Sequence, residues 1–221
     1  MNRKIFIDFH IHSIYSFDSL MSPQEILRQA KKEGLQGIAI TDHNTIKGAQ
    51  EAQKLNRDPE LKVIIGAELK TEVGEIIGIF LKDKISSKKI REVIDEIHSQ
   101  DGLVILPHPY KYKSAISLDK SILEKIDFLE SFNSRCTGKQ NRKAQQLATS
   151  LNKPGVAGSD AHFLQEIGNA KTEVTEDFFH RAITQKSIIS VKGRRSPFYF
   201  QILSQLIKKF KRFYKPLHPN Y

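Results

Sequence analysis

This sequence of 221 residues has few cysteines and lacks long apolar runs and a signal peptide, and each of these absences excludes some classes of protein. It has one cysteine, Cys136, so an internal disulfide is excluded and a reducing compartment is expected. No apolar run is long enough for a transmembrane helix. The stretch from Met1 to Lys4 leads straight into a predicted strand and lacks the apolar segment of a signal peptide. We therefore expect a cytoplasmic protein.

Acidic side chains are missing from Phe178 to the last residue, whereas ten lysines and arginines lie in that stretch. Residues 1–177 hold 25 basic and 25 acidic side chains, so the whole net charge of +10 belongs to the last 44 residues. This asymmetry favours a basic face that meets a polyanion. The alternative is a surface helix whose charges are simply solvated.

Apolar strand-like runs alternate with helical patterns, without internal repeats or low-complexity segments. The runs are nearly continuous, as in a parallel sheet covered on both sides. About seven βα units favour a closed or nearly closed barrel over an open doubly wound sheet. The predicted strands are Lys4–His10, Gly37–His43, Lys62–Leu69, Glu75–Leu81, Leu103–Leu106, Phe128–Phe132 and Val156–Gly158. Two predicted helices begin at Ser22-Pro23, where a capping box ends in Glu25, and near Lys47. The other predicted helices span Ser87–Gln100, Asp119–Lys125, Asn141–Leu151 and Glu176–Gln185.

Five of the eight histidines end predicted strands, and carboxylates accompany them. His10 and His12 are two residues apart at a strand end, so both imidazoles point to one face. Asp8 shares their parity and could bond to a ligand histidine, while Asp18 could fold back from the next loop. The ends of several strands meet at one rim of a barrel. The eight potential ligands are His10, His12, Asp18, His43, Glu68, His108, Asp160 and His162.

A mixture of imidazole and carboxylate ligands suits Zn²⁺, Mn²⁺ or Fe²⁺. Eight ligands are too many for one ion, so two or three divalent ions are expected, with Glu68 or Asp160 as a bridge. Each residue alone has a plainer explanation: Glu68 as an ion-pair partner, His108 as a turn residue, or Asp42-His43-Asn44 as a loop cap. Their joint occurrence favours the polynuclear site. Outside it, we interpret Cys136, His98, His180 and His218 as structural or solvent-exposed.

These motifs together resemble the PHP (polymerase and histidinol phosphatase) family of metallophosphoesterases, over residues 4 to about 193. The motifs, in chain order, are Asp-x-His-x-His-Ser, Thr-Asp-His-Asn, Gly-x-Glu, Pro-His-Pro, Glu-Ser-Phe-Asn-Ser-Arg and Gly-Ser-Asp-Ala-His. The resemblance implies a distorted, TIM-barrel-like (β/α)₇ barrel with a di- or trinuclear centre at its rim, formed by the eight ligands above. Several trinuclear members place a histidine after the fourth strand, where Gly78–Leu81 has none. Residues 1–193 would be the barrel, and 194–221 a basic amphipathic helix packed on it.

Within that family, the chain looks most like the branch that acts on nucleoside bisphosphates and 5′ ends of RNA. The resemblance places Arg135 as a phosphate clamp and Asn133 at the substrate. It implies hydrolysis of phosphate esters by a metal-bound hydroxide, with Asp42 or His43 assisting proton transfer. We expect nucleotides, or the 5′ end of short RNA or DNA, as substrates. The alternatives are a phosphatase of a small monoester such as histidinol phosphate, and a non-catalytic nucleic-acid-binding PHP domain.

The C-terminal stretch Pro197–Lys215 has apolar residues at helical spacing and crowds basic residues into its last turns. Lys208, Lys209, Lys211 and Arg212 are these basic residues. The helix could cap the barrel with its charges solvated, contact the phosphates of an oligonucleotide, or dock on anionic lipid. We expect a phosphorylated small molecule or nucleotide to bind at the predicted metal site. For the C-terminal helix, an oligonucleotide is favoured over an anionic membrane surface as the partner.

Overall fold

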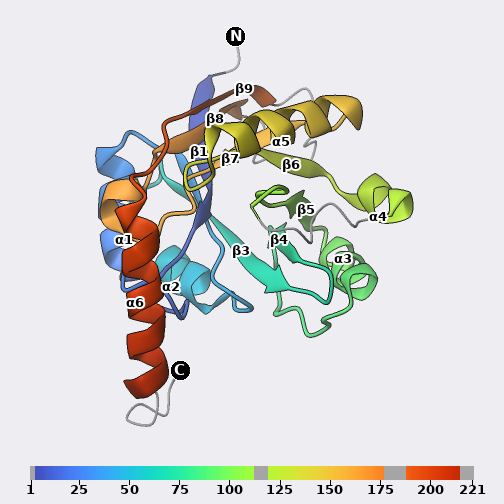
Figure 1. Ribbon diagram of the computed structural model, residues 1–221. Helices are drawn as coiled ribbons and strands as arrows, with labels where there is room; N and C mark the ends of the chain where they lie inside the picture. Colours follow the sequence, from blue (N-terminus) through green and yellow to red (C-terminus); the bar gives the residue numbers. More distant parts are fainter. Residues whose placement is uncertain (1–2, 112–118, 177–187, 215–221) are drawn as a thin grey trace.

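The computed structural model describes residues 3–111, 119–176 and 188–214, and it has an α/β architecture (Figure 1). Its strands are β1 (Lys4–Ile11), β2 (Gly37–Ile40), β3 (Lys62–Lys70), β4 (Glu75–Ile79), β5 (Leu103–Leu106), β6 (Phe128–Asn133), β7 (Gly155–Gly158), β8 (Ala170–Thr175) and β9 (Ile188–Gly193). Its helices are α1 (Pro23–Lys32), α2 (Lys47–Leu55), α3 (Ile90–Ser99), α4 (Lys120–Lys125), α5 (Gly138–Ser150) and α6 (Tyr199–Tyr214). The predicted helix Glu176–Gln185 lies almost wholly outside the described residues.

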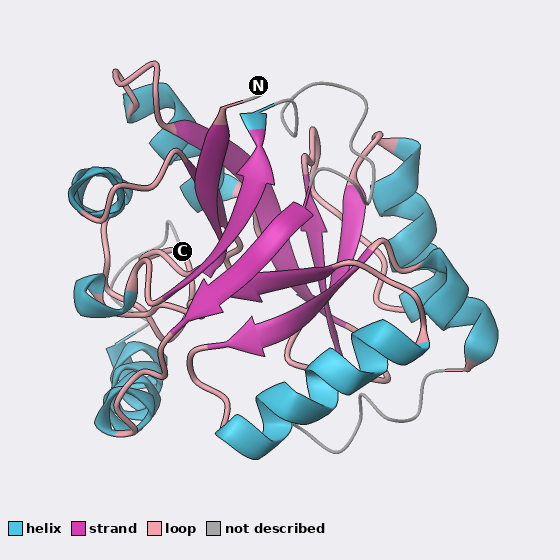
Figure 2. Cartoon of the chain, turned by 90° about the horizontal axis from the view of Figure 1, so that it is seen from above, coloured by secondary structure: helices cyan, strands magenta, loops and turns pink. Residues whose placement is uncertain are grey.

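The strands form one sheet in the order β7-β6-β5-β4-β3-β2-β1-β8-β9, which curls into a nearly closed barrel (Figure 2). The barrel closes where the segment after β7 meets the end of β1. There the amide of His12 donates to the carbonyl of Ala161 at 2.9 Å, and the amide of Ala161 donates to the carbonyl of His10 at 3.3 Å. The helices lie around the outside of the strands. The predicted α/β barrel is therefore confirmed.

Strand β4 runs antiparallel to both of its neighbours, β3 and β5, which differs from the all-parallel barrel expected from the sequence. The reason is a tight turn: the amide of Thr71 donates to the carbonyl of Gly74 at 2.8 Å, and so short a connection makes a hairpin rather than a crossover. The start of β4, not its end, therefore lies at the rim where β3 ends. Strands β8 and β9 were not predicted; they extend the sheet antiparallel beside β1.

Three apolar clusters hold the barrel together. One fills its interior and includes Ile5, Ile7 and Phe9 of β1, and the other two lie between the sheet and the outer helices. Helix α1 begins with the predicted capping box, in which the Ser22 hydroxyl accepts from the amide of Glu25 and the Glu25 carboxylate accepts from the amide of Ser22. The burial of these alternating side chains fixes which face of each strand points inward.

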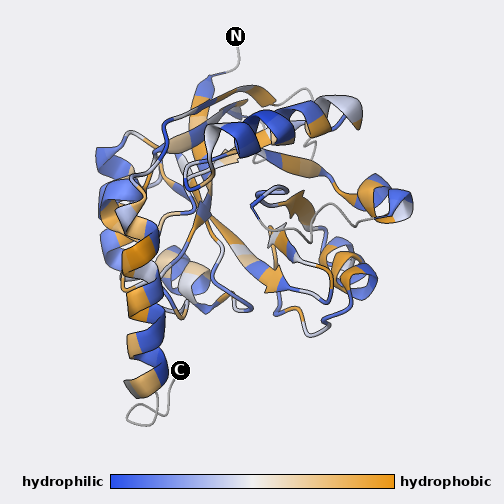
Figure 3. Ribbon diagram, in the orientation of Figure 1, coloured by the Kyte–Doolittle hydropathy of each residue, from blue (hydrophilic) through white to orange (hydrophobic). Residues whose placement is uncertain are grey.

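Helix α6 lies along one side of the barrel and carries much of the exposed apolar surface (Figures 1 and 3). Its first half is attached to the body, where Phe200 is buried with its ring centroid 5.1 Å from that of Phe163. Large apolar side chains of the helix and the residue before it are more than half exposed: Phe198, Tyr199, Ile202, Leu206, Phe210 and Phe213. Among the described residues, no helix combines the length and the apolar character that crossing a membrane requires.

Candidate metal centre

Strand β1 delivers two histidines to the rim because its pairing with β2 is irregular between Asp8 and Ile11. Phe9 packs in the barrel interior, whereas Ile11 packs under the outer helices, so the strand changes faces across this irregularity. His10 and His12 then share the interior side, and their Nε2 atoms lie 3.0 Å apart. Asp8 does not share it. Instead of the expected contact with an imidazole, its carboxylate accepts from the backbone amides of His10, Ser159 and Gly168.

All eight predicted ligands come together at this rim, in four overlapping groups. Within each group, one ligand atom from every residue lies within 4.8 Å of the others. The outer group is His12, Asp18, His43 and His162; the inner groups are His10, Glu68 and His108, then His10, His12 and Asp160, and finally His43, Glu68 and Glu75. Because His10, His12, His43 and Glu68 each belong to two groups, the sites are neighbours that share ligands.

The donor atoms fit divalent cations. Among the described residues, the Oδ1 atom of Asp18 is buried and has no hydrogen-bond partner, although Asp18 belongs to the outer group. The Nδ1 atom of His10 lies 2.9 Å from Oε1 of Glu130, and that of His12 lies 3.1 Å from the hydroxyl of Ser16. Each ring is thus oriented through one nitrogen and presents the other to the cluster, as second-shell contacts do for metal-bound histidines.

Two candidate ligands sit on backbone that side chains rarely adopt. His108 has φ 27° and Asp160 has φ 53°, both in the left-handed region. Such conformations cost roughly 1–3 kcal/mol each and persist where surrounding contacts enforce them. The backbone amide of His108 donates to the carboxylate of Glu130 at 2.7 Å. The side-chain amide of Asn133 donates to the carboxylate of Asp160 at 3.3 Å and helps to hold Asp160 in place. The strain is concentrated where the side chains converge, which is typical of a functional site.

Charge in the cluster shifts the pKa values of its members in opposite directions. Burial, followed by the neighbouring charges of His162 and His43, lowers the pKa of His12 to about 3. Burial opposes the charged form of His43 as well, but its contact with Asp18 and the charge of Glu68 raise its pKa to about 9. Against the effect of burial, His162 and His43 hold the pKa of Asp18 below its ordinary value. These opposed shifts arise because imidazoles and carboxylates pack against one another at the rim, where divalent cations would satisfy the same groups by coordination.

Two carboxylates of the site were missed by the sequence analysis. Glu75 joins Glu68 and His43 in one inner group because antiparallel β4 starts at the rim. Glu130 is buried and contacts both His10 and the amide of His108. A Cβ on Gly158 would lie 2.2 Å from the carboxylate of Glu130, so glycine makes room for this contact.

The two expected substrate residues have other partners in the structure. Asn133 is fully buried, and its amide donates to Glu130 at 2.9 Å and to Asp160 at 3.3 Å. Arg135 is buried in a two-pronged ion pair with Glu166, at 2.9 and 2.5 Å, and donates to the hydroxyl of Ser204 on α6 at 2.9 Å. Both side chains are engaged with neighbouring protein groups, and the role of Arg135 as a phosphate clamp stays a prediction.

Asp42, an expected proton-transfer group, is also fully buried and engaged. Its carboxylate accepts from the amide and the hydroxyl of Ser13 at 2.6 and 2.5 Å, and from the hydroxyl of Ser16 at 2.7 Å. A Cβ on Gly48 would meet this carboxylate at 2.0 Å, so the approach depends on glycine. Asp42 positions the loop after β1 rather than facing the cluster. His43, by contrast, belongs to two ligand groups, which favours its role as a ligand.

Lys111 is a cation at the rim that the sequence did not single out. Its Nζ atom lies 2.5 Å from Oδ2 of Asp160, and the side chain is 18% exposed. No spacing rule marks such a lysine, because the contact depends on the turn after His108. Cys136 is buried, and burial raises the pKa of its thiol to about 12, so it has the passive role expected for it.

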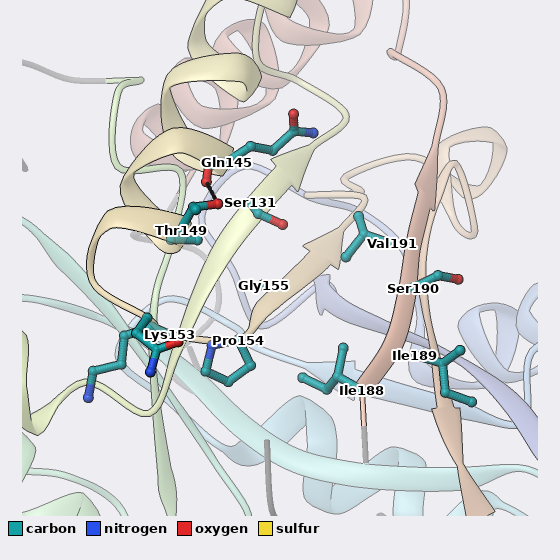
Figure 4. A pocket seen from close by; sticks show the side chains of 12 residues that line it. Ser131, Gln145, Thr149, Lys153, Pro154, Gly155, Ile188, Ile189, Ser190 and Val191 are labelled. Atoms are coloured by element: carbon teal, nitrogen blue, oxygen red, sulfur yellow. Dashed lines mark hydrogen bonds between the residues drawn. The ribbon is translucent and has the colours of Figure 1, made fainter. Parts of the chain in front are cut away.

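A cavity of about 540 Å³ lies at the other end of the barrel strands (Figure 4). It is lined by Pro154 and Gly155, which lead into β7, by Thr149 and Lys153, and by the first residues of β9. The candidate ligands lie beyond the opposite end of β7. This cavity is therefore separate from the metal centre.

Known proteins resemble the chain in sequence and in fold. An uncharacterised protein of Methanocaldococcus jannaschii, MJ1587, is 41% identical over an alignment of 137 residues that covers 57% of this chain and 80% of that protein. A two-domain protein of Bacteroides vulgatus containing a predicted PHP-like metal-dependent phosphoesterase superposes with a TM-score of 0.72 at 17% identity, over 87% of this chain and 66% of that one. Endonuclease Q, solved with a 27-mer duplex substrate bearing an abasic lesion, superposes with a TM-score of 0.63 at 20% identity, over 86% of this chain and 58% of its own.

The structural likenesses, at 20% identity or less, concern the fold. The PHP domain model matches residues 8–185, which include all eight predicted ligands as well as Glu75 and Glu130. This match spans most of the chain, and it agrees with the nearly closed barrel and the ligand groups at its rim. The chain belongs to the PHP domain family.

Proposed function

We propose that this protein is a metal-dependent phosphoesterase that acts on nucleotides or on the 5′ end of short RNA or DNA. The observation that carries the proposal is the sharing of His10, His12, His43 and Glu68 between ligand groups. Shared ligands hold cations close together, and two ions roughly 3.5–4 Å apart can stabilise both the entering and the leaving oxygen of a phosphate ester. A single-ion structural site has no need of such overlap.

The ions, when bound, neutralise the charge of the phosphate and lower the pKa of water to near neutrality. The chain's own residues hold this arrangement in place. Glu130 and Asn133 orient His10 and Asp160 from behind, and Asp42 holds the loop that carries Asp18. Lys111, in contact with Asp160 at the rim, is our candidate for the cation that meets a phosphate oxygen. It takes the role that the sequence suggested for Arg135.

A nucleotide or nucleic-acid substrate is favoured by the surface beside the outer group. Phe17 is 41% exposed, stacks on His43, and has the ammonium group of Lys208 over its ring. An aromatic ring and basic groups beside a phosphate site suit a base and further phosphates. Histidinol phosphate and other small monoesters would use little of this surface. A non-catalytic PHP domain would have no use for the ligand groups, which argues against that alternative.

We expect purified protein to contain at least two divalent ions per chain, because the ligand groups define more than one site. Elemental analysis after purification without chelator measures this content, and Mn, Fe and Zn are the ions expected. With Mn²⁺ added, a 3′,5′-bisphosphonucleoside and a 5′-phosphorylated short RNA should be hydrolysed faster than histidinol phosphate or an aryl phosphate. A folded chain that binds metal but hydrolyses none of the four would support the non-catalytic alternative.

The basic side chains of α6 offer a second test of the proposed substrate class. Lys209 and Arg212 are exposed, whereas Lys208 lies over the ring of Phe17 and Lys211 is engaged with the loop after β1, so these two lysines should be left unchanged. The Lys209→Gln, Arg212→Gln variant should bind an oligonucleotide more weakly, and the slope of log affinity against log salt should fall by about 0.7 per lost phosphate contact. Hydrolysis of an aryl phosphate should be unaffected. If the variant and the unchanged protein bind the oligonucleotide equally well, the exposed basic side chains of α6 are solvated or serve another partner.

A further inference from the structure

The loop between β1 and α1 carries Asp18, and it is held from two sides. On the inside, Asp42 binds Ser13 and Ser16, and the amide of His43 donates to the hydroxyl of Ser16 at 3.1 Å. On the outside, the loop is held by α6, from the far end of the sequence. The Nζ atom of Lys211 donates to the carbonyl of Ile14 at 2.7 Å and to the carbonyl of Ser16 at 2.8 Å.

Phe17, between those carbonyls and Asp18, connects α6 with a second ligand of the outer group. Its ring stacks on His43 with 4.3 Å between centroids and 4° between planes. The Nζ atom of Lys208 lies 4.6 Å from the centroid of the same ring. Because His43 covers one face of the ring at stacking distance, the lysine must approach the other face. Phe17 is thus held between a candidate ligand and α6.

The first half of α6 is fixed beside a third ligand of the outer group. Gln201 donates to the carbonyl of Arg135 at 2.7 Å, and Arg135 donates to Ser204. The partner of Arg135, Glu166, accepts from the amide of His162 at 3.1 Å. One helix therefore contacts the supports of Asp18, His43 and His162. Two of these, Asp18 and His162, belong to the outer group alone.

We propose that α6 braces the outer metal site of His12, Asp18, His43 and His162, and that Lys211 is the positioning residue through which it holds the Asp18 loop. The inference rests on the proposed metal centre but not on any hydrolytic activity. It gives the C-terminal helix a role besides contact with a polyanion. Lys211 holds two backbone carbonyls of the loop, so the loop stays in the conformation that brings Asp18 to His43 and His162.

Metal titration tests the role of Lys211 without any substrate. Metal-free protein is titrated with Mn²⁺ by calorimetry, and the binding step that Asp18→Asn removes defines the outer site. Lys211→Met should weaken this step about tenfold, as loss of a second-shell support does, and leave the other steps unchanged. Lys211→Arg, which keeps a donor, should recover part of the affinity. Lys209→Met, which removes an exposed lysine from the same helix, should titrate as the unchanged protein.

The sign of the effect separates positioning from simple electrostatics. The charge of Lys211 interacts with that of Asp18, so removal of the lysine charge alone would favour cation binding. Weaker binding therefore reports a displaced loop. Lys211→Met binding Mn²⁺ as tightly as Lys209→Met, or weakened equally at every step, would overturn the proposal. Should Lys211→Met not fold, Phe17→Leu removes the ring on His43 without changing α6, and it must weaken the same step for the proposal to stand.

Discussion

Replacement of Glu68 by glutamine is expected to lower hydrolysis on the order of a thousandfold and to remove metal from the protein. Glu68 is buried, and its oxygens lie 2.9 Å from Nε2 of His108, 3.2 Å from Nδ1 of His43 and 3.5 Å from Nε2 of His12. It belongs to two of the four ligand groups, so its loss affects more than one site. An amide has nearly the same shape as the carboxylate, but it lacks the charge that a divalent cation requires.

Elemental analysis and steady-state kinetics measure the two parts of this expectation. Metal content should fall by at least one ion per chain, and the gain in melting temperature on adding Mn²⁺ should shrink, because bound metal stabilises the folded state by mass action. Glu173→Gln is the matched control, since Glu173 pairs with Lys4 and Lys192 on the sheet beside β9. A Glu68→Gln protein with full metal content and full activity would remove Glu68 from the centre.

The strand-end rule explains why the sequence could predict that these eight side chains come together. The carboxyl ends of parallel strands meet at one rim, so a histidine or carboxylate ending such a strand lies near the others wherever the exact boundary falls. The rule fails where strand geometry departs from the ideal. Because of the irregularity in β1, the side chains of Asp8 and His10 lie on different faces of the strand, although an ideal strand would place residues i and i+2 on the same face. Antiparallel β4 brings its first residue, Glu75, to the rim instead of its last.

That reversal could have been predicted from loop length. Only four residues separate Lys70 at the end of β3 from Glu75 at the start of β4, and a parallel crossover needs about a dozen or more residues. The strands β8 and β9 were harder to predict. Their sequences, from Ala170 and from Ile188, mix polar and apolar residues, so neither has the nearly continuous apolar run that marks a strand of the barrel.

Roles of polar side chains could not be predicted in the same way, because a motif does not show which partner a side chain finds. Arg135 and Asn133 lie close together in the sequence with Glu130, and the resemblance placed two of them at the substrate. The partners of Arg135 in the fold, Glu166 and Ser204, lie 31 and 69 residues away from it in the sequence. A long-range ion pair of this kind leaves no periodic signal in the sequence.

The Arg135 pairing leads to the second large expected effect: Arg135→Ala should lower the free energy of unfolding by about 3 kcal/mol or more. The change leaves the carboxylate of Glu166 fully buried without its cation and removes the contact with Ser204. Urea unfolding of metal-free protein measures the loss. Arg135→Ala with Glu166→Ala should cost less than the sum of the two single changes, because neither charge is then left unpaired.

Lys111→Gln is the matched comparison, since it removes a cation that contacts a candidate ligand at the rim rather than one buried against Glu166. We expect Lys111→Gln to cost less stability than Arg135→Ala, because Asp160 keeps its contacts with Asn133 and His12 and the glutamine amide can still donate to it, and to lose turnover on phosphate esters. Arg135→Ala with unchanged stability and a loss confined to turnover would restore Arg135 as the phosphate clamp. If Arg135→Ala loses stability and Lys111→Gln loses turnover, Lys111 is the residue that contacts the substrate phosphate, and Arg135 stabilises the folded protein.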